Sequence, residues 1–410
     1  MTSNVPALCI QDTWYNIDEF IQRHPGGSVI QYYINQDATM VFEEMHRHSK
    51  KAWKVLHSLP TVEKPVIQQH DASTQQMLED FRKWKLSLEE RGFFTHSIRH
   101  TIYRNLEVIA LFAFATYLLS FDSYFAHFLS ALTYGLFGGR CGWLQHEAGH
   151  HSLSGYPTVD KILQKISMGC GLMVSDSMWN SMHNKHHATT QKIDHDIDLD
   201  TMPLVLFHPK AAPKNTSFSS TWLQYQAYTF IPITSGFLVL FFWMFYLHPR
   251  KVIRDKDYLQ AFFMLLGHIG RPYLLSKIVG SNHTFFYCYL HMMFSMYITG
   301  MYLFGHFSLS HTFMPIVEKF ENPNWVEYSL AHTVDIDTQS PLISWIMGYL
   351  NCQCVHHLFP QMPQFRQPQV SNELVEFAKK WDLPYYHISY SKAWSLMLDN
   401  LHTVGARKNI

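Results

Sequence analysis

Histidines occur in three short clusters whose spacing suits metal coordination. His146 and His150 are four residues apart, and His183 and His187 repeat that interval with His186 between them. On a helix, residues three or four positions apart lie on one face, about one turn from each other. Each of these clusters can therefore present two or three nitrogen ligands to a single metal ion.

The third cluster joins a glutamine to two histidines. Gln353 precedes His356 and His357, and Asn351 lies two residues upstream of the glutamine. The three clusters together supply seven histidines and one glutamine, which is enough for two metal ions. Imidazole-rich sites with open positions suit iron among the metals that activate O₂, although the ligand type leaves zinc and manganese as alternatives.

The sequence from His146 to His150 also matches the HExxH pattern of zinc proteases, in which Glu147 would act as the general base. A zinc site with three protein ligands does not need the further histidine clusters. The first cluster also directly follows an apolar segment, which favours a metal site in a membrane protein. Four isolated histidines are assigned to packing or to an interface: His100, His127, His268 and His291.

The composition indicates a membrane protein with metal or haem chemistry. The chain contains 27 histidines, which a membrane protein keeps mainly for metal, proton or haem chemistry. Aromatic residues make up 15% and charged residues only 16%, below the usual proportion of charge. The 32 basic residues balance the 32 acidic ones, which argues against a nucleic-acid partner. The six cysteines form no CxxC pair and are interpreted as reduced packing residues in a reducing compartment.

Five apolar segments must position the histidine clusters. Residues 106–121 and 124–139 are separated by two polar residues and are expected to form a transmembrane hairpin. Three more apolar segments lie between the second and third clusters, at 228–247, 258–279 and 284–309. These three cannot all cross the membrane if the second and third clusters are to share one side of it.

We therefore expect 228–247 to be an in-plane or re-entrant helix, and 258–279 and 284–309 to form a second hairpin that turns at 280–282. The loop at 248–257 carries four basic residues, which favours the cytosolic side. The opposite assignment, with 228–247 crossing and 258–279 interfacial, stays open. Either assignment places all three clusters on the cytosolic side. Asn282 begins a glycosylation pattern on the expected lumenal turn.

The two ends of the chain are expected to be soluble. Residues 1–60 are predicted to form a small domain with one helix at 42–59, and 61–100 a linker with an amphipathic helix at 77–90. The membrane domain is expected to span 101–410, with a soluble tail from 363 that contains a helical run at 372–381. The first forty residues lack a basic region followed by an apolar one, so no cleavable signal peptide is expected and the N-terminal domain should stay in the cytosol.

At these motifs the chain resembles the fatty acid desaturases that carry a fused cytochrome b5 domain, the front-end group. HEAGH, HNKHH and QCVHHLFP are similar to the three histidine boxes of that group, and the glutamine that opens the third box is the most specific mark. The likeness covers nearly the whole chain. The resemblance implies these iron ligands: His146, His150, His183, His186, His187, Gln353, His356 and His357, with His311 as a further histidine that the family often carries.

The segments around His24-Pro-Gly-Gly27 and His46 are similar to the haem-binding half of the same group. The resemblance implies that His24 and His46 are the two axial ligands of a haem b, with His48 ranked second. Bis-histidine ligation leaves no open position, which suits electron transfer. The strand expected before Trp14 is short or missing. The implied fold is a small α+β cytochrome b5-like domain, followed by an all-α integral membrane domain with about four transmembrane helices and a cytosolic cap that holds the boxes.

The chain departs from the family pattern at several positions. The first box commonly has Asp where Glu147 stands, and His151 adds an extra candidate ligand after it. Cys354 and Val355 replace the middle of the third box, which commonly contains an acidic residue. Tyr349 stands where relatives often have His or Gly. These changes concern substrate preference more than reaction type.

The resemblance implies O₂-dependent desaturation of a fatty acyl chain at a di-iron centre, with electrons from NADH delivered through a separate cytochrome b5 reductase and the fused haem. The implied partners are a fatty acyl-CoA or phospholipid substrate, the reductase and the bilayer, with the catalytic face on the cytosolic side of the endoplasmic reticulum. A sphingolipid long-chain-base desaturase, a membrane hydroxylase and a haem-anchored electron carrier without turnover are the alternatives. Residue spacing leaves open the double-bond position and the length of the acyl chain.

Overall fold

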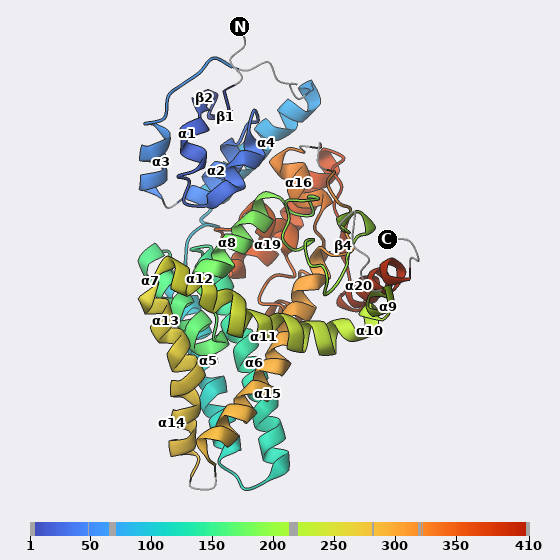
Figure 1. The fold of residues 1–410 in the computed structure, drawn as a ribbon. Helices are drawn as coiled ribbons and strands as arrows, with labels where there is room; N and C mark the ends of the chain where they lie inside the picture. The colour runs from blue at the N-terminus through green and yellow to red at the C-terminus, as the bar shows by residue number, and fades with distance from the viewer. Residues whose placement is uncertain are drawn as a thin grey trace.

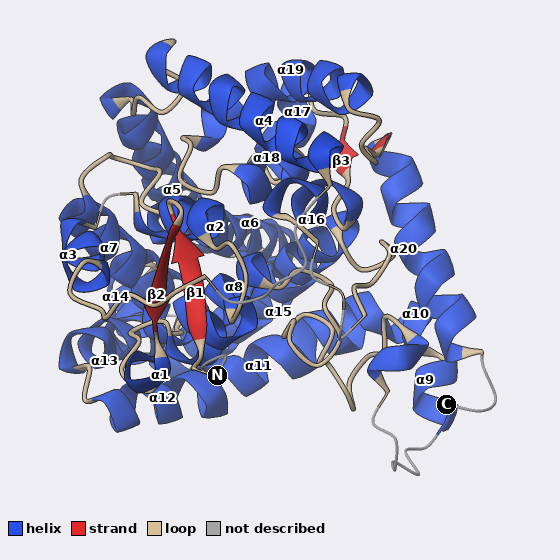
Figure 2. Cartoon of the chain, turned by 90° about the horizontal axis from the view of Figure 1, so that it is seen from above, coloured by secondary structure: helices blue, strands red, loops and turns tan. Residues whose placement is uncertain are grey.

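The structure is a computed structural model that describes residues 5–47, 49–64, 71–212, 220–280, 283–318, 321 and 323–406. Figure 1 shows a small N-terminal domain on top, a layer of shorter helices below it and a long helical bundle at the bottom. Strands form a small part of the chain, as the view from above in Figure 2 makes plain. An α+β domain followed by a mostly helical domain is therefore confirmed. The helical domain is not purely α, because β3 (Asp335–Ile336) and β4 (His387–Ile388) pair in parallel.

The N-terminal domain folds around a short hairpin. Strand β1 (Ala7–Ile10) pairs antiparallel with β2 (Thr13–Asn16), so the strand before Trp14 is present and is four residues long. The helical elements that follow are α1 (Asp18–Ile21), η1 (Gly27–Tyr33), α2 (Thr39–His46) and α3 (Lys50–Leu56). The apolar core that these elements share contains Leu8, Ile10, Tyr15, Ile17, Ala38, Val41 and Leu56.

The single helix predicted at 42–59 is wrong, because the chain forms two helices there. α2 ends at His46 and α3 begins at Lys50. The side-chain oxygen of Ser49 accepts a hydrogen bond from the backbone N–H of Ala52 and so caps the start of α3. This local cap interrupts a run of good helix formers. His48 lies outside the described residues, as do 65–70 of the expected linker.

Helix α4 (Ala72–Glu90) connects the N-terminal domain to the rest of the chain. Asp71 caps its start by accepting a hydrogen bond from the backbone N–H of Thr74 at 2.7 Å, and Gly92 follows its end at a φ of +79°. Its apolar face buries Met77, Phe81 and Leu88. The amphipathic helix predicted at 77–90 is therefore confirmed and is five residues longer at its start.

Four helices form the long bundle: α5 (Ile98–Leu119), α6 (Tyr124–Gly149), α14 (Arg271–Ile278) and α15 (Phe285–Phe307). α6 packs against α5 and α15, and α14 packs against α15. The α6–α15 contact is close, since a Cβ added at Gly139 would overlap the ring of Tyr302. Both hairpin turns lie at the bottom end of the bundle in Figure 1, away from the N-terminal domain. Asn282 lies outside the described residues of the second turn.

The apolar segment after the second histidine cluster runs in a different direction from the bundle. Residues Gln226–Asp255 form one helical stretch. It consists of α10 (Gln226–Thr229), η4 (Phe230–Val239), α11 (Leu240–Phe242), η5 (Trp243–Leu247) and α12 (His248–Asp255). Gln226–Asp255 and Ile98–Leu119 are the two described helices that are long and apolar enough to cross a membrane. In Figure 1 the stretch around α10 and α11 lies across the top of the bundle, not along it. α13 (Tyr258–Leu265) then leads through η6 (Leu266–Gly270) down into α14.

The soluble tail predicted from residue 363 is wrong. Helix α19 (Gln367–Lys380) is longer than the predicted run at 372–381 and buries Val370, Leu374 and Phe377 against α4 and α18 (Gln353–Leu358). Helix α20 (Tyr390–Gly405) buries a second apolar stripe. Apolar residues three or four positions apart give each helix a buried face, so the C-terminal segment is part of the layer that holds the third histidine cluster.

Candidate metal centre

Five of the predicted ligands meet in one group. The donor atoms of His146, His150, His183, His187 and His356 all lie within 4.8 Å of one another. The first two come from the end of α6, the next two from α8 (Asp176–Ala188) and the last from α18. Nε2 of His183 lies 2.9 Å from Nε2 of His150 and 3.1 Å from Nε2 of His187. Nε2 of His356 lies 3.1 Å from Nε2 of His187.

A second group adjoins the first. The donor atoms of His186, His311 and His357 lie within 4.8 Å of one another, and all three side chains are buried. The side-chain amide of Gln353 donates a hydrogen bond to Nε2 of His311 at 2.7 Å. His311 follows α15 and reaches this group from a different element than the others. The structure therefore brings together all nine residues that the resemblance implies as ligands.

Histidines that are adjacent in the sequence belong to different groups, which places the two groups side by side. His187 belongs to the first group and His186 to the second, and His356 and His357 divide in the same way. The rings of His187 and His357 stack with their centroids 4.3 Å apart. Two metal ions held by these groups would be close neighbours, because residues next to each other in the sequence bind different ions.

His187, His356 and His357 are in the protonation state that metal binding needs. Burial lowers the pKa of His187, His356 and His357 well below its usual value, and the neighbouring histidines add to the effect. These rings are therefore neutral at physiological pH and keep a lone pair for a metal ion. The indole of Trp179 stacks on His183 with a centroid distance of 4.2 Å and helps to exclude water from one side.

Polar partners outside the two groups orient the rings. Nδ1–H of His186 donates to the buried carboxylate of Asp196 at 3.1 Å. Burial lowers the pKa of His186, but Asp196 and Asp198 outweigh it and raise that pKa to about 9. Thr190 donates its hydroxyl proton to the backbone carbonyl of His186 at 2.9 Å, which leaves its oxygen to accept from Nδ1–H of His357 at 3.1 Å. These contacts direct the Nε2 atoms inward.

His146 has an orienting partner of the same kind. The amide of Gln364 lies 2.8 Å from Nδ1 of His146, and a rotation of the amide lets its oxygen accept from Nδ1–H. Gln364 follows the third cluster in a segment that the sequence analysis assigned to a tail. Its role was missed because only the fold brings it to the first cluster.

Glu147 does not face the histidine groups. Its carboxylate is fully buried, lies 3.1 Å from Nε2 of His100, and accepts a hydrogen bond from the backbone N–H of Gln364 at 3.2 Å. Arg104 lies 3.9 Å away on the same side. A general base of a zinc protease must face the metal-bound water, so this orientation disagrees with the HExxH interpretation. His100 is therefore a partner of Glu147 and not a packing residue alone.

His151 does not join either of the two histidine groups formed by the described residues. It follows the end of α6 in the left-handed conformation, with a φ of +57°, and its backbone carbonyl lies 3.3 Å from Nε2 of His96. The helix has ended, so the regular spacing that brings His146 and His150 to one face no longer applies. The extra candidate ligand is therefore wrong.

The carboxylate of Asp335, on strand β3, lies next to the helix that carries the third cluster. Asp335 on β3 accepts a hydrogen bond from the backbone N–H of Cys354 at 2.8 Å and another from the hydroxyl of Tyr385 at 2.8 Å. Burial raises the pKa of Asp335 to about 6. Asp335 thus anchors the start of α18, the helix that carries Gln353, although the third box has no acidic residue of its own.

The N-terminal domain brings the rings of His24 and His46 close together, with their planes at 86°. Their ring centroids are 6.3 Å apart, the separation expected for two imidazoles on opposite sides of one metal ion with bonds of about 2 Å. Nδ1–H of His24 donates to the carbonyl of Gly27 at 3.1 Å, which directs Nε2 toward His46. Burial lowers the pKa of both rings, that of His46 to about 4. The pair therefore fits a haem with two histidine ligands.

Comparison with known families agrees with both sites. The model of the family described as "Fatty acid desaturase" matches residues 122–389, and that of the "Cytochrome b5-like Heme/Steroid binding domain" matches residues 2–83. The chain belongs to the fatty acid desaturase family. It is an oxidoreductase that joins a desaturase domain to an N-terminal cytochrome b5-like domain, which confirms the resemblance to front-end desaturases.

Similar desaturases cover almost the same length. An acyl-lipid (8-3)-desaturase of Rebecca salina is 38% identical over 97% of this chain and 91% of its own length. An acyl-lipid (8-3)-desaturase of Thraustochytrium is 36% identical over 97% and 92%. A Delta(6)-fatty-acid desaturase of Caenorhabditis elegans is 28% identical over 94% and 93%. The desaturase reading is therefore favoured over the electron-carrier alternative.

The geometry around His186 predicts a metal-binding role for a residue outside the two groups. Asp196→Ala removes the acceptor that orients the His186 ring, and loss of such a partner costs about 10–100-fold in metal affinity. We expect the purified variant to retain much less iron per chain, as measured by atomic emission spectrometry. Asp200→Asn, which changes an exposed carboxylate of the same acidic run, should retain the unmutated amount. Equal iron in Asp196→Ala and the unmutated chain would contradict the role of Asp196.

Proposed function

We propose that the chain catalyses O₂-dependent front-end desaturation of a fatty acyl chain carried on a lipid, at two iron ions held by its nine clustered donors. The observation that carries this proposal is the pair of adjacent buried groups, five histidines in one and three histidines with Gln353 in the other. The reaction removes two hydrogens from the acyl chain and reduces O₂ to two molecules of water, with two electrons and two protons supplied from outside. Bound iron would supply the chemistry of O₂ reduction and hydrogen removal.

The donor set supports iron over zinc. Five imidazoles in one group exceed the four positions of a structural zinc site. None of the three candidate metal-binding groups among the described residues includes a cysteine. Cys354, which lies next to Gln353 in the sequence, accepts a hydrogen bond from Thr333 instead. Imidazole and amide ligands without thiolate are compatible with iron that reacts with O₂.

The protein contributes position and exclusion of water. His146, His186, His187, His356 and His357 are all almost inaccessible to solvent. Outer hydrogen bonds keep His146, His186 and His357 in place before substrate arrives, so little reorganisation of these rings is needed during the reaction. A dry site also protects a strong oxidant from side reactions. The acyl tail then enters this buried region while the polar part of the lipid remains in water.

The relatives guide the proposal for the substrate. The two acyl-lipid (8-3)-desaturases are 38% and 36% identical to this chain, compared with 28% for the Delta(6)-fatty-acid desaturase. We therefore assign the chain to the acyl-lipid (8-3) class. Because these two relatives are named acyl-lipid desaturases, we propose a lipid-bound acyl chain as the substrate in preference to acyl-CoA.

The fused domain is proposed to deliver the electrons. His24 and His46 would hold haem b in the domain at 1–60, the segment 61–100 connects it, and 101–410 forms the desaturase domain. NADH is the source of electrons through a separate cytochrome b5 reductase. Two half-buried, neutral imidazoles would hold the haem with no position left for O₂, which suits electron transfer.

The four-helix bundle is proposed to cross the membrane of the endoplasmic reticulum. Its helices expose large apolar side chains, among them Phe114, Phe125 and Phe294, which suits contact with lipid. The helical stretch Gln226–Asp255 lies across the top of the bundle, exposes Tyr228, Phe237 and Phe245, and carries basic residues near its end. If the bundle crosses the membrane, this stretch lies in the membrane plane on the cytosolic side. Both hairpin turns are at the opposite end, so the histidine groups and the N-terminal domain share the cytosolic face.

The first test concerns the ligands. Gln353→Ala removes one donor of the second group, so we expect desaturation to fall by more than the about 100-fold that loss of an outer partner can cost. The readout is lipid profiling by gas chromatography after expression in a host that lacks polyunsaturated lipids, together with iron per chain. Gln361→Ala changes another buried glutamine of the same region and serves as the matched control. Full activity of a folded, membrane-inserted Gln353→Ala protein would show that Gln353 is not a ligand.

The second test concerns topology. A reporter that is active only in the cytosol, fused after Pro360, should be active, and the same reporter inserted at Gly280 should be inactive. In this arrangement no helix crosses the membrane between the first and second histidine clusters, and two cross between the second and third. All three clusters therefore lie on the same side. Activity at Gly280 together with inactivity after Pro360 would contradict the arrangement.

A further inference from the structure

Buried ion pairs fix the helix that ends at His46 to helix α4. Nζ of Lys85 on α4 lies 2.7 Å from the carboxylate of Glu44 and 3.1 Å from that of Glu43 on α2. The Glu44 side chain is 2% exposed and that of Lys85 is 11% exposed. Arg47 donates to Glu89 of α4 at 2.7 Å. Charge-assisted hydrogen bonds in a buried setting allow few alternative geometries, so the N-terminal domain is held in one orientation on α4.

A chain of contacts leads from this docked helix to the third histidine box. The guanidinium of Arg47, the residue after His46, lies 3.9 Å above the ring of Phe94. The ring of Phe94 meets the ring of Phe359 edge to face, with centroids 5.7 Å apart. Phe359 is fully buried and follows His357 by two residues. Bonds and packed side chains therefore connect one proposed haem ligand to one proposed iron ligand.

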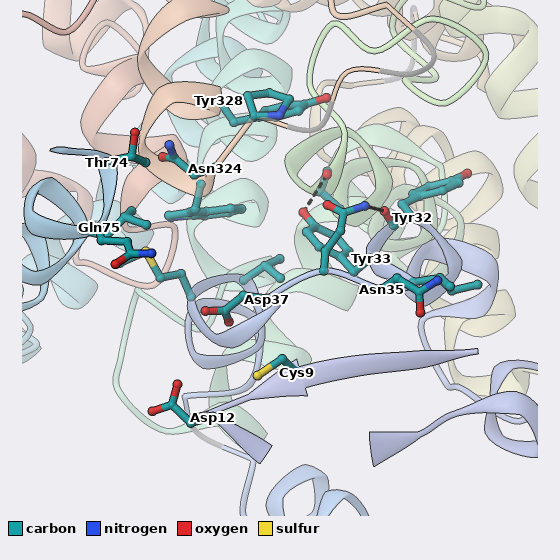
Figure 3. Close-up of a pocket in the computed structure, with 18 of the residues that line it drawn as sticks. Cys9, Asp12, Tyr32, Tyr33, Asn35, Asp37, Thr74, Gln75, Asn324 and Tyr328 are labelled. Carbon is teal, nitrogen blue, oxygen red and sulfur yellow. Dashed lines mark hydrogen bonds between the residues drawn. The ribbon is translucent and has the colours of Figure 1, made fainter. Parts of the chain in front are cut away.

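Another contact between the domains borders a cavity. The hydroxyl of Tyr33 donates to the carbonyl of Ala188 at 2.8 Å, one residue after His187. Tyr33 and Ala188 line a cavity of about 1090 Å³ between the N-terminal domain and the remainder of the chain. In Figure 3 Tyr32 and Tyr33 stand on one side of this cavity, and Asn324 and Tyr328 belong to the other domain. Tyr33 also lies at the end of η1 away from His24, whereas Arg47 is bonded directly to His46.

We propose that electrons pass from the N-terminal domain to the metal centre through Arg47, Phe94 and Phe359. This inference rests on the proposed function of the two sites. In each transfer one electron leaves ferrous haem, which becomes ferric, and reduces one ferric ion of the metal centre to ferrous. No bond forms or breaks, and a cytochrome b5 reductase returns the haem to the ferrous state. Close packing favours this route because electron transfer slows when a gap separates the groups, and protein interiors leave few gaps.

The test measures the transfer itself and not product. The full chain, loaded with haem and ferric iron in detergent, is photoreduced at the haem without O₂, and the Soret band reports reoxidation by the metal centre. We expect Phe94→Leu and Arg47→Gln each to slow reoxidation severalfold, with unchanged haem spectrum and iron content. Phe94→Tyr keeps the ring and should retain the unmutated rate. Tyr33→Phe removes the hydroxyl on the cavity side and should also retain it.

The outcomes separate the route from the proposed function. If Phe94→Leu and Arg47→Gln react at the unmutated rate, or if Tyr33→Phe is the variant that slows, the route is wrong although both metal sites stand. If the unmutated chain reoxidises its haem no faster with iron than without it, the haem does not feed this centre. That result overturns the route and the electron-delivery part of the proposed function together.

Discussion

The structure depends on burying a cluster of imidazoles while hydrogen bonds on the outer side orient His146, His186 and His357. Burial alone lowers the histidine pKa and leaves a free nitrogen on each ring. Asp196, Thr190 and Gln364 each orient one ring, those of His186, His357 and His146. The surrounding helices serve this requirement, because α6, α8, α18 and the segment after α15 must bring their residues to one place.

Different layers of the fold contribute different residues to the two histidine groups. The bundle supplies the end of α6, and the close α6–α15 contact at Gly139 places His311 beyond the end of α15 near the second group. The layer above supplies α8 and α18, with α18 packed between α16 (Trp325–Ala331) and α19. The N-terminal domain then rests on α4, whose apolar face packs in the same core as α18. The proposed haem site and the two histidine groups are thus connected through one helical layer.

The sequence could indicate which histidines lie together, because the spacing within each cluster is local. Residues at intervals of three and four on a helix, such as His183 and His187, must share a face. The position of His311 came from resemblance, since no local spacing connects it to the third box. The sequence could not indicate Gln364, Asp335 or the pair of Thr190 with His357, because each depends on segments far apart in the chain. Those contacts form only when the C-terminal helices fold onto α4.

The errors also have physical causes. The helix predicted at 42–59 ignored the capping preference of Ser49, which is worth about 1 kcal/mol. The tail predicted from 363 ignored the apolar stripe of α19, which becomes a buried face only next to α4 and α18. His151 was a candidate ligand because it directly follows His150, but α6 ends at Gly149. Two of these errors missed the residue at which a helix begins or ends, and the third missed a packing partner far away in the sequence.

The most direct test of the account is the metal itself. X-ray absorption at the iron edge of the purified, iron-loaded enzyme, combined with a metal count per chain, reports the number of iron ions and the atoms bound to them. The account predicts two iron ions per chain, surrounded by nitrogen and oxygen with no sulfur, and a second iron visible as a near neighbour. A single iron ion per chain, or sulfur among its ligands, would contradict it.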